Sequence, residues 1–431
     1  MRVAVVGSGI AGLTATWKLG LEHEVELFEA QPTLGMDAAS VSVDLGRAHA
    51  RVDVPLRVFG SGYYPRLTEL YAEAGIPRGG ADYSASYSRL GGPSYFAYKT
   101  VELGGDRAVS LPDPRVGRPS ENLTRLAQGA RFYLSEPLRL KAGAIGDVAL
   151  EAYLCRRGYA AAFTEDVLYP TLAAILTCSQ DDVRAAPAAA VIDFFGRSAG
   201  TSFGRVATGT RTVVERLSAR AARIHVGTPV RRVRRASDGV LVEAGEAEQR
   251  FDHVVMATQA HLARRLVADL DDEERALFDA VGVTSFECVV HSDPALMPED
   301  RRGWRPINAL IGDPRGMPMY TMWMNAIIDD LGGRPDLFQT INPLRAPDPA
   351  LEHHRIRLDR PLLDLEGQAA VRRLAELQRA PGRRLWFCGS YLTDGFPLLE
   401  AGVVSASAVA EGILGSGAAA PPARRSGPRR P

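Results

Sequence analysis

The chain has 431 residues, of which 46% are hydrophobic and 24% are charged, and it contains 42 Gly, 28 Pro and 4 Cys. This composition excludes a wholly disordered, collagenous or disulfide-scaffold chain. Lys+Arg and Asp+Glu both number 51, so the chain lacks the basic excess of nucleic-acid-binding proteins, and we expect no nucleic acid partner.

Signals for export, membrane insertion and metal binding are missing from the sequence. The N-terminal residues enter a strand-like run directly, without a cleavage site of small residues. No apolar run reaches the ~18 residues of a membrane helix. The cysteines are scattered without metal-ligand spacing, at Cys155, Cys178, Cys288 and Cys388. We therefore predict a cytoplasmic, reduced protein without a metal, for which a peripheral membrane contact stays open.

The first thirty residues carry the most informative pattern. Residues 2–6 are small or β-branched, as in a strand that is buried on both faces of a parallel sheet. Residues 7–12 read G-x-G-x-x-G, residues 14–19 are helical in character, and residues 23–28 predict a second strand that ends at Glu29. In this order, the glycines permit a tight turn and a close approach to a pyrophosphate at the helix N-terminus, and the acid accepts the ribose hydroxyls. The pattern predicts a dinucleotide-binding Rossmann unit.

The middle of the chain is predicted in chain order from its periodicity. Strand-like runs cover residues 40–44 and 50–54, and an amphipathic helix covers 64–74. Residues 120–220 are predicted to be mainly helical, with helices over 120–135, 147–157, 160–168, 172–176 and 211–222.

Strands return in the second half of the chain. They are predicted over 224–226, 229–234, 240–243, 252–257, 287–291, 337–342 and 382–389. The run at 252–257 is expected to rejoin the dinucleotide-binding sheet. A helix is predicted from about Gly402 to Leu414, and the low-complexity tail 415–431 is expected to be disordered.

Together these motifs resemble the flavin-containing amine oxidoreductase superfamily. Within it, the chain is similar to a branch of FAD-binding oxidoreductases that resemble phytoene and fatty-acid desaturases. Landmarks of this branch are Val52-Asp53, Phe59, Tyr64-Pro65, Trp323-Met324-Asn325, residues 340–343, residues 386–391 and Glu411.

The resemblance implies an α/β fold with a glutathione-reductase-type FAD-binding Rossmann domain and a discontinuous, inserted α+β substrate domain. The FAD-binding part would comprise residues 1–60, 205–270 and 381–414, and the substrate part 61–204 and 271–380. The implied FAD contacts are Gly7, Gly9, Ile10, Ala11, Gly12, Glu29, Ala30, Gly35, Val230, Gly389, Ser390, Gly402, Val403 and Val404. Of these, Val403 and Val404 would face the flavin from a helix start.

The sequence departs from the family pattern in three places. After Gly35, where the family has a second glycine and a polar or basic residue, this chain has Met36 and Asp37, and Ser390 replaces an acid. Amine oxidases of the superfamily typically hold a lysine near the flavin from the second half of the chain. Here the only lysines are Lys18, Lys99 and Lys141, which argues against an ordinary amine oxidase.

The resemblance therefore predicts an FAD-dependent oxidoreductase that takes a hydride from a carbon of a small apolar or amphipathic substrate. A fatty-acyl, isoprenoid or polyketide-like desaturase or dehydrogenase is expected. The alternatives are an FAD-dependent double-bond isomerase, an amine oxidase and a protein that has lost the flavin. Candidate pocket residues are Tyr320, Trp323, Asn325, Tyr391 and Phe396. The sequence identifies no catalytic base, and we expect a structural role for His291.

Overall fold

The computed structural model describes residues 1–37, 40–44 and 49–417. Its N-terminal strand lies in a five-stranded sheet of order β10-β2-β1-β14-β20, with every pair parallel. The strands are β1 (Arg2–Val6), β2 (Glu24–Phe28), β10 (Arg223–His225), β14 (His253–Met256) and β20 (Leu385–Phe387). The predicted return of residues 252–257 to this sheet is confirmed by the pairing of β14 with β1.

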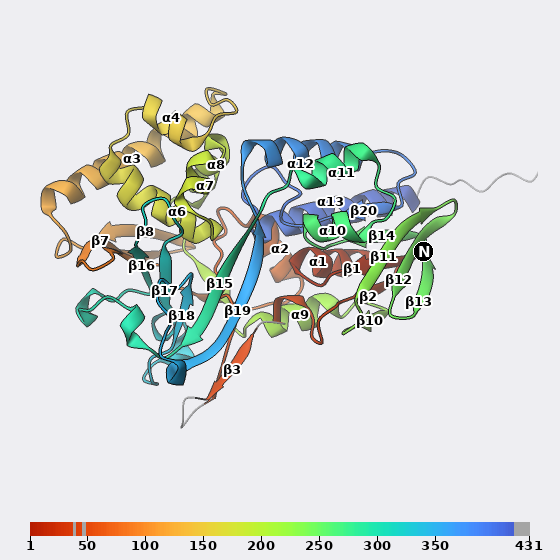
Figure 1. The fold of residues 1–431 in the computed structure, drawn as a ribbon, viewed down its shortest axis with the longest axis horizontal. Helices are drawn as coiled ribbons and strands as arrows, with labels where there is room; N and C mark the ends of the chain where they lie inside the picture. The colour runs from red at the N-terminus through yellow and green to blue at the C-terminus, as the bar shows by residue number, and fades with distance from the viewer. Residues whose placement is uncertain (38–39, 45–48, 418–431) are drawn as a thin grey trace, which may run out of the picture.

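Burial explains why these short runs form central strands. In β1, Val3, Ala4 and Val5 are wholly buried, because helices cover the sheet on its faces. Helix α1 (Ile10–Leu19) packs on α13 (Leu399–Gly417), and both lie beside the sheet in Figure 1. A continuous apolar run is typical of a parallel sheet that is covered in this way.

A three-stranded antiparallel meander lies at the edge of the half of the molecule that contains the five-stranded sheet (Figure 1). It consists of β11 (Val230–Ala236), β12 (Gly239–Ala244) and β13 (Ala247–Phe251). Two short antiparallel pairs join β3 (Val41–Asp44) to β4 (His49–Val52) and β5 (Arg78–Gly80) to β9 (Gly204–Val206).

The other half of the molecule contains an eight-stranded sheet of order β19-β15-β18-β17-β16-β6-β7-β8. Its strands are β6 (Ala85–Arg89), β7 (Ser94–Gly104), β8 (Arg107–Pro112), β15 (Val283–His291), β16 (Ile307–Ile311), β17 (Met319–Trp323), β18 (Phe338–Ile341) and β19 (Glu352–Pro361). The long strands β15 and β19 run along the boundary between the two halves (Figure 1). The sequence patterns of β5 to β9, β13 and β19 were not recognised as strands.

The segment 120–220 is mainly helical, as predicted. Above the eight-stranded sheet in Figure 1 lie α3 (Pro119–Lys141), α4 (Leu150–Arg156), α5 (Ala161–Phe163), α6 (Tyr169–Leu176), α7 (Gln180–Ala185) and α8 (Ala188–Ser198). The remaining helices are α2 (Pro65–Glu73), α9 (Thr210–Ser218), α10 (Ala260–Leu266), α11 (Asp272–Asp279) and α12 (Leu365–Leu377).

The predicted domain boundaries stay a prediction. One observation bears on the first segment, residues 1–60, which was predicted to belong to the FAD-binding part. Val43, Ala50 and Val52 of the β3–β4 pair share a core with residues of the eight-stranded sheet. At the other end, α13 continues to Gly417, and the tail from 418, predicted to be disordered, lies outside the described residues.

His291 at the end of β15 has the structural role expected for it. It is wholly buried. Its Nδ1 accepts the Asp293 N–H at 3.1 Å, so the proton resides on Nε2, which donates to the Thr340 hydroxyl at 2.7 Å. Burial lowers the pKa of His291 from 6.5 to about 4.

This pKa predicts an acid sensitivity of the fold. Between pH 6.5 and 4 the unfolded chain binds a proton at His291 that the folded chain does not, so stability falls as the pH is lowered through this window. At pH 4.5 the loss from this group is about 2.5 kcal/mol. Urea unfolding of wild type and His291→Gln at pH 7 and 4.5 measures it: the variant should lose less stability on acidification by about this amount. Equal losses in the two proteins would contradict the expectation.

Candidate functional site

The loop between β1 and α1 leaves open space at one glycine. Gly7 has a φ of +100°, a conformation that favours glycine. A Cβ at Gly12 would overlap the carbonyl oxygen of Gly7, so Gly12 is needed for the close packing of α1. A Cβ at Gly9, which is the N-cap of α1, would meet no atom within 4 Å. The space in front of Gly9 faces the helix N-terminus, where backbone N–H groups attract phosphate oxygens.

Glu29 at the end of β2 is held beside this loop by Ser8. The carboxylate accepts the Ser8 N–H at 3.1 Å and the Ser8 hydroxyl, and it accepts the Gln31 N–H at 2.9 Å. The Ser8 hydroxyl in turn accepts the Gly35 N–H at 2.7 Å, and a Cβ at Gly35 would overlap the Ser8 carbonyl oxygen. The network draws the loop that follows Glu29 onto the glycine-rich turn.

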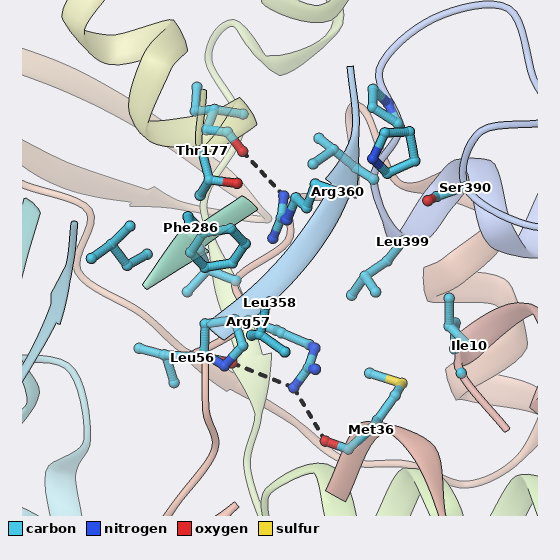
Figure 2. A pocket seen from close by; sticks show the side chains of 18 of the residues that line it. Ile10, Met36, Leu56, Arg57, Thr177, Phe286, Leu358, Arg360, Ser390 and Leu399 are labelled. Atoms are coloured by element: carbon cyan, nitrogen blue, oxygen red, sulfur yellow. Dashed lines mark hydrogen bonds between the residues drawn. The ribbon is translucent and has the colours of Figure 1, made fainter. Parts of the chain in front are cut away.

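A cavity of about 440 Å³ extends from this loop to the face of the eight-stranded sheet. Figure 2 shows Ile10, Ser390 and Leu399 on one side of it and Phe286, Leu358 and Arg360 on the other. The dinucleotide-binding end is lined by Gly9, Ile10, Ala11, Gly35, Met36, Ala257, Thr258, Gln259, Gly389, Ser390, Tyr391, Pro397, Leu398 and Leu399. The cavity therefore joins the two halves of the chain.

Three buried polar atoms at the dinucleotide-binding end have no hydrogen-bond partner within the described residues. They are Thr258 Oγ1, Gln259 Oε1 and the Tyr391 hydroxyl. A buried polar atom without a partner costs about 1–3 kcal/mol, so these atoms favour a polar ligand in the cavity. With the open space at Gly9 and the acid at Glu29, they fit an adenine dinucleotide such as FAD.

Arg57 places a positive charge beside Met36, where the sequence lacks one. Its guanidinium donates to the carbonyl oxygens of Met36 at 3.3 Å and Pro55 at 3.4 Å (Figure 2). The Met36 side chain is buried in the main core. The family has a polar or basic residue in this segment, and here Arg57 supplies a positive charge from a different segment. This charge would stabilise the pyrophosphate or the reduced flavin.

The far end of the cavity is mostly apolar. Its apolar side chains are Leu56, Val58, Ala174, Ile175, Phe286, Ile307, Met322, Ile327, Ile341 and Leu358. Tyr64 and Tyr83 also line it, and burial raises the pKa of Tyr83 to about 12, so its hydroxyl stays protonated at neutral pH. Charged residues also line the cavity, among them Arg360 of β19 and the acids Asp82 and Asp359.

Comparison with known proteins supports the assignment of the dinucleotide-binding end and identifies the fold of the chain. Residues 5–74 match the model of an NAD(P)-binding Rossmann-like domain. No curated protein matches the sequence. Among solved structures, the CLA-producing fatty acid isomerase from P. acnes is similar, with 15% identity and a TM-score of 0.65 over 95% of this chain and 97% of that one.

Two further structures agree. An oxidoreductase from Methanosarcina mazei has 12% identity and a TM-score of 0.63, over 95% of this chain and 100% of the other. Cyclohexylamine oxidase from Brevibacterium oxydans has 14% identity and a TM-score of 0.58, over 96% and 99%. The chain has the fold of the flavin amine oxidoreductases. The predicted class, an α/β Rossmann domain with an inserted substrate part, is thereby confirmed.

In this fold the glycine-rich loop and the closing segment meet as expected. Gly9, Ile10, Ala11, Gly35, Gly389 and Ser390 all line the cavity. Gly7 and Gly12 shape the loop behind them. Ala30 is exposed next to Glu29, and Val230 lies at the start of β11, outside the cavity lining. The adenosine contacts of Glu29, Ala30 and Val230 stay predictions.

The predicted helix start near Gly402 is wrong. Helix α13 begins at Leu399, so Pro397, Leu398 and Leu399 line the cavity there. Val403 is buried in the main core and Val404 is 39% exposed. Gly402 instead faces α1, where a Cβ would lie 2.8 Å from Ile10 Cγ2. The helix begins within the apolar run that starts at Phe396, three residues before the glycine that was taken as its start.

Of the five candidate pocket residues, Tyr320 and Tyr391 line the cavity. The Tyr320 hydroxyl donates to the Pro170 carbonyl.

The other three candidates lie elsewhere, and this part of the prediction is corrected. Trp323 packs against Trp304 and donates from Nε1 to Asp336 at 2.9 Å. The Asn325 amide is bonded to the backbone of the loop 331–337. Phe396 is stacked on Phe194 with ring centroids 4.4 Å apart. Each side chain is used in local packing.

Sequence reasoning missed Arg57, Thr258, Gln259, Phe286 and Arg360. The sequence contained a signal for the strand that carries Arg360. Residues 356–359 alternate between apolar and charged side chains, a period of two that is typical of a strand, and β19 shows the same alternation in burial. Thr258 and Gln259 follow β14 directly, at the carboxyl edge of a parallel sheet, where such folds bind ligands.

Two further findings concern membrane-spanning helices and the cysteines. In the described residues, no helix is long and apolar enough to cross a membrane. All four cysteines, Cys155, Cys178, Cys288 and Cys388, are free thiols.

Proposed function

We propose that this protein is an FAD-dependent oxidoreductase that takes a hydride from one carbon of an apolar or amphipathic substrate, while the neighbouring carbon releases a proton to water, and that leaves a carbon–carbon double bond. The observation that carries the proposal is one continuous cavity of about 440 Å³, polar at the glycine-rich loop and apolar at the eight-stranded sheet. Bound FAD would supply a two-electron acceptor for the hydride.

The residues of the chain bind and orient the reactants. The N–H groups at the start of α1, from Ile10 and Ala11, would hold the pyrophosphate, and Glu29 would accept the adenosine ribose hydroxyls. Apolar side chains such as Phe286 and Ile341 would exclude water and hold an aliphatic chain against the cofactor end. No metal enters this proposal, and the cytoplasmic location stays a prediction.

An isomerase that moves a double bond without net oxidation is the second candidate. It is favoured by the similarity to the P. acnes fatty acid isomerase at a TM-score of 0.65. Amine oxidation is disfavoured because the described lining residues include no lysine.

An absorbance spectrum of the purified protein tests the proposal. We expect the bands of oxidised flavin, and their release into the supernatant by acid or heat would show that the FAD is not covalent. Anaerobic addition of an unsaturated or saturated acyl substrate should bleach the bands for an oxidoreductase, with a product lighter by two hydrogens. A product of unchanged mass would establish the isomerase, and peroxide release with amines would establish the amine oxidase. A protein that stays colourless with added FAD would overturn all three.

A further inference from the structure

Arg360 is placed at the apolar end of the cavity by the pleat of β19. Leu358 and Arg360 are two residues apart, so their side chains project from the same face of the strand, and both line the cavity. The intervening Asp359 and the preceding Arg357 are exposed, and of these two only Asp359 also contributes to the cavity lining. Figure 2 shows Arg360 beside Phe286, with Leu358 between Arg360 and Arg57.

The guanidinium of Arg360 is poorly compensated. It donates to the Ile175 carbonyl at 3.3 Å and lies 5.6 Å from the centroid of the Phe286 ring. Within the described part of the chain, no carboxylate forms an ion pair with it. The two acids that line the cavity are engaged elsewhere, since Asp359 accepts the Ser285 hydroxyl at 2.5 Å and Asp82 accepts the Ser84 N–H at 2.8 Å.

The positive charge of Arg360 is unfavourable in this position. Burial lowers the pKa of Arg360, and the nearby positive charge of Arg57 lowers it further. An arginine stays protonated in proteins, so the apolar end of the cavity carries a half-buried cation, and Arg57 adds a second positive group near it. Removing a charge from water is unfavourable unless an anion or a set of acceptors meets it. A carboxylate matches the planar donor set of a guanidinium in two parallel hydrogen bonds.

We propose that Arg360 binds the carboxylate of an amphipathic carboxylic acid, whose hydrocarbon chain lies along Phe286, Leu358 and Ile341. This inference rests on the proposed function and narrows its substrate class from apolar compounds in general to acids with a free carboxylate. It also gives the substrate a fixed direction in the cavity, because one end is bound by charge and the rest by apolar contact. Arg360 is a specificity-determining residue in this scheme.

The test uses the FAD-loaded full chain and two probes, dodecanoic acid and its methyl ester, below their aggregation concentrations. Binding is followed by the change in the flavin absorbance bands and by calorimetry. We expect wild type to bind the acid at least about tenfold more tightly than the ester, since hydrogen bonds between charged groups contribute about 1.5–3 kcal/mol. Arg360→Gln should weaken binding of the acid by about 10- to 100-fold and leave the ester unchanged.

Arg357→Gln is the matched control. It removes the same charge from the same strand on the exposed face, and it should bind the acid as wild type does. Arg360→Lys should restore part of the affinity, because a point charge replaces the planar donor set.

Three results would overturn the proposal. They are equal binding of acid and ester by wild type, unchanged binding of the acid by Arg360→Gln, and loss of FAD from Arg360→Gln, which would assign the residue to the cofactor. Failure of the proposed function is seen separately, as wild type that takes up no FAD. Calorimetry with the acid still decides the role of Arg360 in that case.

Discussion

Replacing Gly9 with valine is expected to abolish FAD binding and to leave the folded chain intact. A Cβ at Gly9 meets nothing within 4 Å, and the backbone there, with φ −64° and ψ −178°, is extended and open to any residue. The valine methyl groups would instead fill the space in front of the N-terminus of α1, where the pyrophosphate must approach the backbone. We expect the dissociation constant for FAD to rise by at least about 10³-fold, since several charge-assisted hydrogen bonds are lost together.

The measurement is a titration of the purified apoprotein with FAD, followed by flavin fluorescence, together with a thermal unfolding curve by circular dichroism. Gly146→Val is the matched control, because a Cβ at Gly146 also meets no atom within 4 Å and Gly146 does not line the cavity. Both variants should unfold near the wild-type temperature, and only Gly9→Val should fail to bind FAD. Retention of wild-type affinity in Gly9→Val would place the pyrophosphate elsewhere.

Replacing Gly12 with valine is expected to fail at the level of folding. A Cβ at this position would overlap the backbone carbonyl oxygen of Gly7 and lie 3.2 Å from Ala257 Cβ. The obstacle is backbone, which cannot rotate away as a side chain can. Helix α1 would have to leave the sheet, and with it the contact with α13. We expect a loss of more than about 4 kcal/mol in the free energy of unfolding, seen as insoluble protein or as loss of the cooperative thermal transition.

Gly129→Ala provides the control for a helical glycine that has room. It lies inside α3, and its added Cβ would make only an ordinary contact, 3.6 Å from the Phe163 ring. Here we expect a gain of about 0.5–1 kcal/mol from the reduced freedom of the unfolded chain. A Gly12→Val protein as stable as wild type would show that α1 can shift away from β1, contrary to the packing described above.

The two glycines also show which parts of the site could be predicted. The order of strand, glycine-rich turn, helix, strand and acid is local, and each residue type has its own steric or electrostatic reason. Gly9, Gly12 and Glu29 lie at the turn, in the helix and at the strand end that this order predicts, while their contacts with FAD stay predictions. The return of β14 to the same sheet was also predicted, and β20 was predicted as a strand. The start of α13 was missed because a glycine can lie within a helix when a close contact requires it.

The other end of the cavity could not be predicted in the same way. Trp323, Asn325 and Phe396 have residue types that suit a pocket, yet they are used in packing or loop contacts. The choice between the two roles depends on neighbours that come from distant segments. Arg360 faces the cavity only because β19 pairs with β15 in one register, with Thr284 opposite Arg360. A shift of that register by one residue would turn Asp359 inward instead.

By itself, the sequence determined the dinucleotide-binding unit, the superfamily-type fold and the lack of lysine in the second half of the chain. Short-range sterics and hydrophobic periodicity are sufficient for the dinucleotide-binding unit, whereas the fold of the whole chain was implied by the resemblance to a known superfamily. The tertiary structure alone decided that Arg57 and Arg360 meet in one cavity with Phe286, since these residues lie on segments far apart in the chain. Their convergence follows from long-range strand pairing, which no local pattern encodes.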